Sequence, residues 1–172
     1  YHELAEVQQR ITKKIGRRTL VVALCKNSIG SVAGYAAFIN MHIVPILLNA
    51  QMEKELMANI LSIYMPAFLW VPSDMLADDL FSSMKIVCSE YDYSLLKSAY
   101  EHEYPLYDEL GLLLTTSGST GSPKFVRQSY TNILSNAKSI VKYLELDESE
   151  RPITTLPMNY TYGLSIINSH LL

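Results

Sequence analysis

Apolar and polar residues alternate along the first part of the chain in two distinct periods. The opening segment carries apolar residues three or four positions apart among Glu, Gln, Arg and Lys, namely Leu4, Val7, Ile11 and Ile15. This spacing predicts an amphipathic helix that ends at Gly16. Short β-branched or apolar runs at residues 19–24, 43–47 and 67–71 predict buried strands.

Helical patterns lie between these runs. Asn27 or Ser28 is a suitable cap for the first helix, whose inward stripe is predicted to be Ile29, Val32, Ala33 and Ala36. The second helix is marked by Leu56, Ile60 and Ile63. Strands that alternate with helices of about three turns favour parallel pairing through right-handed crossovers. The sequence therefore predicts an α/β fold with a mostly parallel, doubly wound sheet and helices on both faces.

The second half of the chain has a weaker pattern. Residues 85–89 resemble a short strand, whereas residues 91–110 lack a clean period and are predicted to cross the surface. A strand at 112–116, an extended run at 125–128 and a strand near 153–156 are predicted. One further helix is expected to turn Ile133, Ala137, Ile140 and Leu144 inward, and another to open at Tyr162 or Gly163.

Composition narrows the class of protein. The 172 residues are 49% apolar and 18% charged, which excludes a disordered chain and suits one domain. A net charge of −3 gives no general attraction to nucleic acid or to an anionic membrane. No apolar run approaches the ~20 residues of a membrane span, and the acidic start is unlike a signal peptide, so a cytoplasmic location is expected. Cys25 and Cys88 close apolar stretches and are expected to behave as small hydrophobes.

Candidate chemistry is concentrated in one segment. Residues 115–122 contain only Thr, Ser and Gly, between an apolar run at 112–114 and the pair Pro123-Lys124. Successive backbone N–H groups, hydroxyls and one mobile cation at Lys124 are the groups that a polyphosphate requires. The Gly-Lys-Ser/Thr ending of a Walker loop is absent. A plain polar turn between two strands is the alternative reading.

The nine residues from Thr116 to Lys124, Thr-Ser-Gly-Ser-Thr-Gly-Ser-Pro-Lys, resemble the phosphate-loop signature of the adenylate-forming, AMP-binding superfamily. That superfamily includes acyl- and aryl-CoA synthetases, adenylation domains of peptide synthetases, and luciferases. Two other segments fit the resemblance. The stretch from Tyr1 to Pro45 is similar to the opening of the large domain, and the stretch from Leu156 to Leu164 resembles its next core motif. The resemblance therefore spans most of the chain.

The resemblance implies a two-step ligase reaction. A small-molecule carboxylate attacks the α-phosphate of MgATP to give an acyl-adenylate and pyrophosphate, and a thiol then takes the acyl group. The implied thiol is coenzyme A or the phosphopantetheine of a carrier protein, and Mg²⁺ is bound through ATP. The resemblance assigns ATP-phosphate binding to Thr116, Ser117, Gly118, Ser119, Thr120, Gly121 and Lys124.

The chain departs from the family pattern at two places. Phe125 follows the lysine where the family usually has Gly, and Tyr160 stands three residues before Gly163 where an aromatic residue or His is common. A tyrosine can wall an acyl pocket or contact a carboxylate, but it cannot act as an imidazole. The resemblance implies substrate binding by Tyr160, Tyr162 and Gly163. Packing at a strand-to-helix turn is the alternative for both tyrosines.

The full proteins of this family are longer and carry an adenine-binding motif, an acidic residue for the ribose and a carboxy-terminal lid with a catalytic lysine. Residues 1–172 are therefore interpreted as the amino-terminal portion of the large domain, without the lid domain and without an assigned catalytic residue or metal ligand. We expect no turnover from them alone. Two alternatives stay open: a non-catalytic nucleotide-binding or interaction module, and a serine hydrolase or amidase that uses Ser117 or Ser119.

Overall fold

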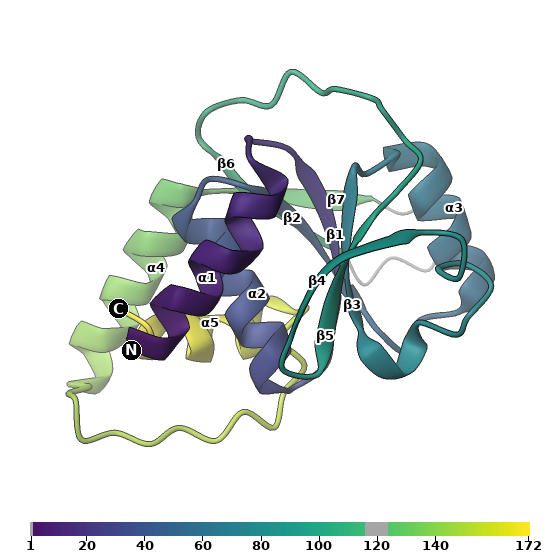
Figure 1. Cartoon of the computed structure of the whole chain (residues 1–172). Helices are drawn as coiled ribbons and strands as arrows, with labels where there is room; N and C mark the ends of the chain where they lie inside the picture. Colours follow the sequence, from purple (N-terminus) through teal and green to yellow (C-terminus); the bar gives the residue numbers. More distant parts are fainter. Residues whose placement is uncertain (1, 116–123) are drawn as a thin grey trace.

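A computed structural model describes residues 2–115 and 124–172 (Figure 1). Gly16 ends the first helix in the left-handed conformation, with φ of 73° and its N–H bonded to Thr12 O, as the sequence predicted. The elements in chain order are α1 (His2–Ile15), β1 (Leu20–Cys25), α2 (Ile29–Asn40), β2 (Val44–Asn49), α3 (Lys54–Tyr64), β3 (Phe68–Pro72), the 3₁₀ turn η1 (Ser73–Met75), β4 (Lys85–Glu90), β5 (Tyr93–Lys97), β6 (Leu110–Thr115), β7 (Phe125–Ser129), α4 (Tyr130–Leu144) and α5 (Thr161–His170).

The described strands form one seven-stranded sheet in the order β4-β5-β3-β1-β2-β6-β7. β1 pairs in parallel with β2 and β3, and β2 pairs in parallel with β6. β5 is antiparallel to β3 and β4, and β7 is antiparallel to β6. The α/β fold is confirmed, and the sheet is mixed. Helices connect β1 to β2 and β2 to β3, which allows these strands to be parallel, and β6 joins them in parallel after the long connection from β5. The tight turn between β4 and β5 allows only antiparallel pairing.

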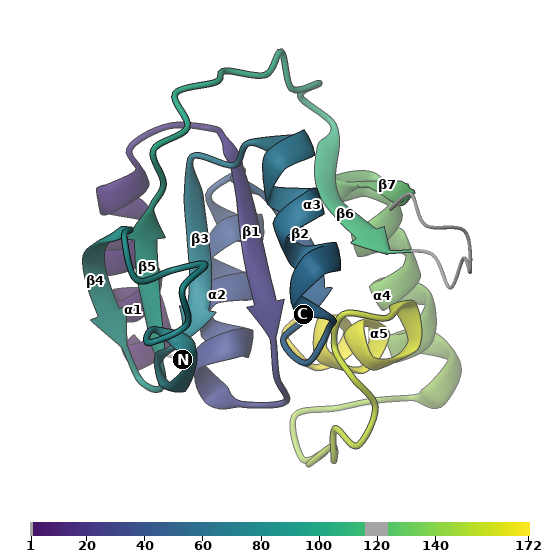
Figure 2. The same ribbon diagram turned by 90° about the vertical axis from the view of Figure 1, so that its right-hand side faces the viewer.

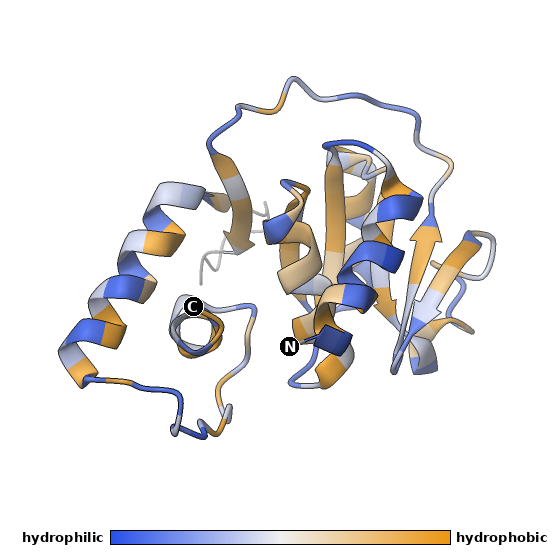
Figure 3. Ribbon diagram, turned by 60° about the vertical axis from the view of Figure 1, so that its left-hand side comes forward, coloured by the Kyte–Doolittle hydropathy of each residue, from blue (hydrophilic) through white to orange (hydrophobic). Residues whose placement is uncertain are grey.

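Helices cover both faces of the sheet, as predicted. The connections from β1 to β2 and from β2 to β3 run in opposite directions along the sheet, so right-handed crossovers place α2 and α3 on opposite faces. Figures 1 and 2 show α3 on one side and α1, α2, α4 and α5 on the other. In Figure 3 the central strands are mostly hydrophobic, whereas the outer helices alternate between hydrophobic and hydrophilic positions.

β1 is the centre of the core. All six of its residues are buried, because a central parallel strand contacts helices on both faces. Val21 and Ala23 belong to the apolar cluster beneath α1 and α2, and Val22 and Leu24 belong to the cluster beneath α3. Cys25, the last residue of β1, is buried, and desolvation raises the pKa of its thiol to about 12. The expectation of a small buried hydrophobe is met at this position.

The expectation that residues 91–110 cross the surface is wrong for their first part. β5 (Tyr93–Lys97) is a buried strand between β3 and β4. Tyr93 is fully buried, its hydroxyl donates to Leu24 O over 2.8 Å, and its ring stacks on Trp70 with centroids 5.4 Å apart. Ser94 shares a hydrogen bond of 2.8 Å with Ser89 of β4. Tertiary partners therefore stabilise a strand that lacks a clean apolar period.

The prediction of a strand near residues 153–156 is also wrong. Residues 151–155 form no regular structure, and Ile153 is 80% exposed. No neighbouring strand pairs with this segment among the described residues, so its apolar residues have no sheet to join.

The stripe predicted for α2 is confirmed at Ala33 and Ala36 and is wrong at Ile29, which is 68% exposed. The stripe predicted for α4 is confirmed at Ala137 and is wrong at Leu144, which is 57% exposed. Among the described residues, no helix is long and apolar enough to cross a membrane.

Candidate functional site

The carboxyl ends of the parallel strands lie at one edge of the sheet (Figure 2). There the chain leaves β1 toward α2 on one face and leaves β2 toward α3 on the other. A crevice at such a reversal is where doubly wound sheets bind ligands. β6 ends at this edge with Thr115, one residue before the predicted phosphate loop. Six predicted loop residues lie outside the described residues: Thr116, Ser117, Gly118, Ser119, Thr120 and Gly121.

Lys124 is exposed and directly precedes β7. The next residue, Phe125, pairs with Thr115 across the β6–β7 ladder, so Lys124 lies close to the carboxyl end of β6. The Phe125 ring meets Tyr64 of α3 edge-on, with centroids 4.9 Å apart, and packs against the apolar cluster beneath α3. The aromatic residue that departs from the family pattern thus anchors the start of β7 to α3.

The motif at residues 156–164 forms the turn that opens α5. Tyr160 is the N-cap residue of α5 and is 46% exposed, and Tyr162 is 68% exposed. Gly163 is buried against the preceding turn. A Cβ atom at Gly163 would lie 2.4 Å from Pro157 O and 2.7 Å from Leu156 O, so the close approach of the backbone requires glycine.

Asn27 holds this motif against the carboxyl end of β1. Its Nδ2 donates to Thr154 O over 2.9 Å and to Leu156 O over 3.0 Å, and its Oδ1 accepts from the Met158 N–H over 3.3 Å. The sequence suggested only a capping role for Asn27. Ser28 occupies the N-cap position of α2, but its side chain makes no cap hydrogen bond. The polar residue after β1 therefore acts across the fold, and only its position at a strand end could have indicated this.

A groove of about 670 Å³ lies between α4 and α5, over β6. Its apolar residues come from β6 and from the facing sides of the two helices, and the remainder are polar and uncharged. The lining residues, which we call the α4–α5 groove, are Leu112, Leu114, Gln128, Asn132, Ile133, Ser135, Asn136, Ser139, Ile140, Thr161, Tyr162, Leu164, Ser165 and Asn168. Tyr162 therefore lies at the groove, whereas Tyr160 and Gly163 do not line it.

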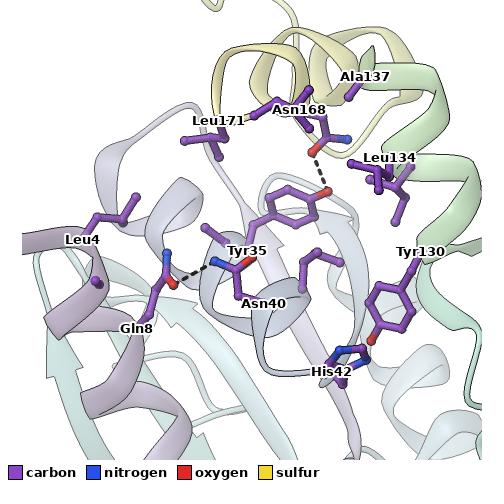
Figure 4. Close-up of a pocket in the computed structure, with 15 residues that line it drawn as sticks. Leu4, Gln8, Tyr35, Asn40, His42, Tyr130, Leu134, Ala137, Asn168 and Leu171 are labelled. Carbon is purple, nitrogen blue, oxygen red and sulfur yellow. Dashed lines mark hydrogen bonds between the residues drawn. The ribbon is translucent and has the colours of Figure 1, made fainter. Parts of the chain in front are cut away.

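A second cavity of about 610 Å³ lies between α1, α2, α4 and α5 (Figure 4). The Tyr35 hydroxyl donates to Asn168 Oδ1 over 2.7 Å, and Asn40 Nδ2 donates to Gln8 Oε1 over 2.9 Å. Burial raises the pKa of Tyr35, so its hydroxyl stays protonated and remains a donor. Asn168 lines both this cavity and the α4–α5 groove, and its side-chain oxygen is occupied by Tyr35.

In residues 2–115 and 124–172, no group of three or more His, Cys, Asp or Glu side chains could hold a metal ion. A profile of the AMP-binding enzyme family matches residues 4–172. The chain belongs to the AMP-binding enzyme family.

Several AMP-binding enzymes are similar to this chain. A 2-succinylbenzoate–CoA ligase from Geobacillus sp. (strain WCH70) is 23% identical over 165 residues, which are 95% of this chain and 33% of the relative. A 3,4-dihydroxybenzoate–[aryl-carrier protein] ligase from Bacillus anthracis is 37% identical over 59 residues, 34% of this chain and 14% of the relative. The structure of O-succinylbenzoate coenzyme A synthetase from Bacillus subtilis, in complex with ATP and a magnesium ion, matches with a TM-score of 0.68. It is 22% identical and covers 98% of this chain and 47% of that chain.

The chain spans about a third of the length of the first of these AMP-binding relatives. The likeness to the solved synthetase shows the shared fold at 22% identity. The matched range, residues 4–172, includes the Thr/Ser/Gly loop, the motif that opens α5 and nearly all of the stretch from Tyr1 to Pro45, the three segments that carried the sequence resemblance.

Removal of the Asn27 amide is expected to loosen the motif of this AMP-binding chain. Asn27→Ala deletes three hydrogen bonds to residues 154–158. Because the freed carbonyls can bond to water, we expect a loss of about 1–2 kcal/mol in the free energy of unfolding. Hydrogen exchange of peptides that cover residues 152–159 should accelerate.

Asn40→Ala is the matched control, because it deletes an exposed amide whose side-chain bond goes to Gln8 instead of the motif. In Asn40→Ala, the backbone amides of peptides that cover residues 152–159 should exchange hydrogen at the wild-type rate. Equal exchange in both variants would contradict the role given to Asn27.

Proposed function

We propose that the full-length protein activates a carboxylic acid with ATP, forms an acyl-adenylate and pyrophosphate, and then transfers the acyl group to a thiol. The supporting observation is the placement of β6. This strand lines the α4–α5 groove through Leu112 and Leu114 and ends at Thr115, directly before the Thr/Ser/Gly loop. One strand therefore connects a groove that can hold an acyl group to a loop that can hold phosphates.

The loop supplies the electrostatic part of the proposed reaction. Backbone N–H groups and hydroxyls of Thr116, Ser117, Gly118, Ser119, Thr120 and Gly121, with the ammonium of Lys124, would hold the ATP phosphates. Pyrophosphate gains negative charge as it leaves, and preorganised donors stabilise that charge most strongly where water is excluded. Mg²⁺ would enter bound to the phosphates. The complex of the Bacillus subtilis synthetase with ATP and magnesium supports this choice of nucleotide and ion.

The acid is assigned to the start of α5 and the adjoining groove. Tyr162 lines the groove, Tyr160 caps α5, and Gly163 allows the turn between them to pack closely. The thiol is proposed to be coenzyme A or the phosphopantetheine of a carrier protein, because the similar proteins include a CoA ligase and an aryl-carrier protein ligase. In this proposal residues 1–172 form the amino-terminal portion of the large domain, the lid lies elsewhere, and the enzyme acts in the cytoplasm.

The loop can be tested with Thr120→Ala and Gly121→Val in the full-length protein. Thr120→Ala removes a hydroxyl donor, and Gly121→Val restricts the backbone whose N–H groups would hold the phosphates. Each change is expected to raise the adenylation barrier by about 2–4 kcal/mol, which lowers the rate by about 30- to 900-fold. ATP–pyrophosphate exchange with an accepted acid measures this step directly.

Thr131→Ala is the matched control, since Thr131 lies at the start of α4 and its hydroxyl donates to Glu109. This variant should exchange pyrophosphate at the wild-type rate. Unchanged exchange in both loop variants would remove the loop from the mechanism. Labelling of Ser117 or Ser119 by a fluorophosphonate would instead favour a serine hydrolase.

A further inference from the structure

The α4–α5 groove has a lining without formal charge. Of its fourteen residues, none is Asp, Glu, Lys, Arg or His, and five are aliphatic. The nine others are polar and uncharged, namely Gln128, Asn132, Ser135, Asn136, Ser139, Thr161, Tyr162, Ser165 and Asn168. Within the described residues, a molecule in this groove meets an apolar floor and neutral hydrogen-bonding groups.

Three serine hydroxyls in the lining already use their hydrogen atoms. Ser135 donates to Asn132 O over 3.2 Å, and Ser139 donates to Ser135 O over 2.8 Å. On α5, Ser165 donates to Tyr162 O over 2.7 Å. A hydroxyl that donates to its own helix still carries lone pairs. These three side chains therefore present hydrogen-bond acceptors to the groove.

Asn168 uses its side-chain acceptor and keeps its donors, unlike the three serines. Its Oδ1 accepts the hydroxyl hydrogen of Tyr35 over 2.7 Å, so the amide N–H groups of Asn168 are the donors that it can offer. A carboxylate in the groove would meet no cationic side chain among the lining residues and would lose its water without a counter-charge. A hydroxyl or an N–H group would find acceptors on both helices.

We propose that the α4–α5 groove selects acids whose body is uncharged and carries a hydroxyl or N–H donor, and discriminates against acids with a second carboxylate. This inference rests on the proposed function, because it takes the groove as the place of the acyl group. The aliphatic floor from β6 contacts the carbon skeleton of such an acid, and the serine oxygens of α4 and α5 accept its donors.

Three para-substituted benzoates form a matched set of probes, because 4-hydroxybenzoate, 4-methylbenzoate and terephthalate share the ring and the reacting carboxylate. Their binding to the full-length protein is measured by calorimetry, and their use by ATP–pyrophosphate exchange. We expect 4-hydroxybenzoate to bind at least about tenfold more tightly than 4-methylbenzoate, the change that one added hydrogen bond produces. Terephthalate should bind most weakly.

A change of charge in the groove should reverse this preference. Ser139 lies on the exposed side of α4, where a lysine is compatible with the helix. In Ser139→Lys, the binding of terephthalate relative to 4-methylbenzoate should rise at least about tenfold. Tyr143→Lys adds the same charge to the same helix at an 86% exposed position outside the groove lining, and should leave the order unchanged.

The two readouts separate the inference from the proposed function. If the acids bind in the expected order but neither they nor any other class of carboxylic acid supports exchange, the inference stands and the proposed function is wrong. If terephthalate is preferred by the wild-type protein, or if none of the three acids binds, the inference is overturned. Exchange with some other class of acid would then leave the proposed function intact.

Discussion

Replacement of Trp70 by alanine is expected to lower the free energy of unfolding by about 3–5 kcal/mol, the usual cost of truncating a large buried aromatic side chain. Trp70 lies in β3 and is 1% exposed. Its ring stacks on Tyr93 and meets Phe38 edge-on, and its Nε1 donates to Gly30 O over 2.9 Å. A Cβ atom at Gly34 would lie 2.2 Å from Trp70 Nε1, so the ring packs directly against the backbone of α2.

Chemical denaturation measures this loss. Trp70 is the only tryptophan of the chain, so unfolding must be followed by circular dichroism and not by fluorescence. Trp70→Phe is the matched variant, because it keeps an aromatic ring and loses the donor to Gly30. We expect it to cost less than the alanine variant. A loss below about 1 kcal/mol in Trp70→Ala would contradict the central place of this ring.

Replacement of Arg18 by methionine is expected to cost about 2–4 kcal/mol, because several hydrogen bonds from one charged group are lost together. Nη1 donates to His42 O over 2.7 Å and to the Tyr130 hydroxyl over 3.1 Å. Nη2 donates to Tyr107 O over 2.6 Å and to Leu110 O over 2.8 Å. Arg18 thereby joins the chain before β1 to the starts of β2, β6 and α4.

The neighbouring arginine provides the control for this variant. Arg17 pairs with Glu103 on the surface, where both side chains are more than half exposed. Exposed ion pairs contribute little, so Arg17→Met is expected to change the free energy of unfolding by less than about 1 kcal/mol. Equal losses in the two variants, measured by urea denaturation, would show that the contacts of Arg18 add nothing to stability.

The sequence predicted the elements whose residues follow a simple period. α1 ends at Gly16 because glycine adopts positive φ readily, and β1, β2 and β3 are apolar runs that suit strands buried on both faces. The prediction was wrong where partners distant in sequence decide the structure. β5 contains Tyr93 and Ser94, which are stabilised in the sheet by Leu24 and Ser89. A strand was predicted at Ile153, but no strand pairs with it among the described residues.

For the candidate site, too, some features could be predicted from the sequence and others came only from the tertiary structure. Local composition and the resemblance together predict phosphate binding by the Thr/Ser/Gly loop with Lys124, because hydroxyls, glycines and one cation are properties of a short segment. This assignment stays a prediction. The roles of Asn27 and of the α4–α5 groove came from tertiary structure. Asn27 bonds a carbonyl 127 residues away, and two serines of α4 line the same groove as Ser165 of α5. The sequence determines which side chains are present. Only the folded structure decides which of these side chains contact one another and which of their hydrogen atoms already take part in hydrogen bonds.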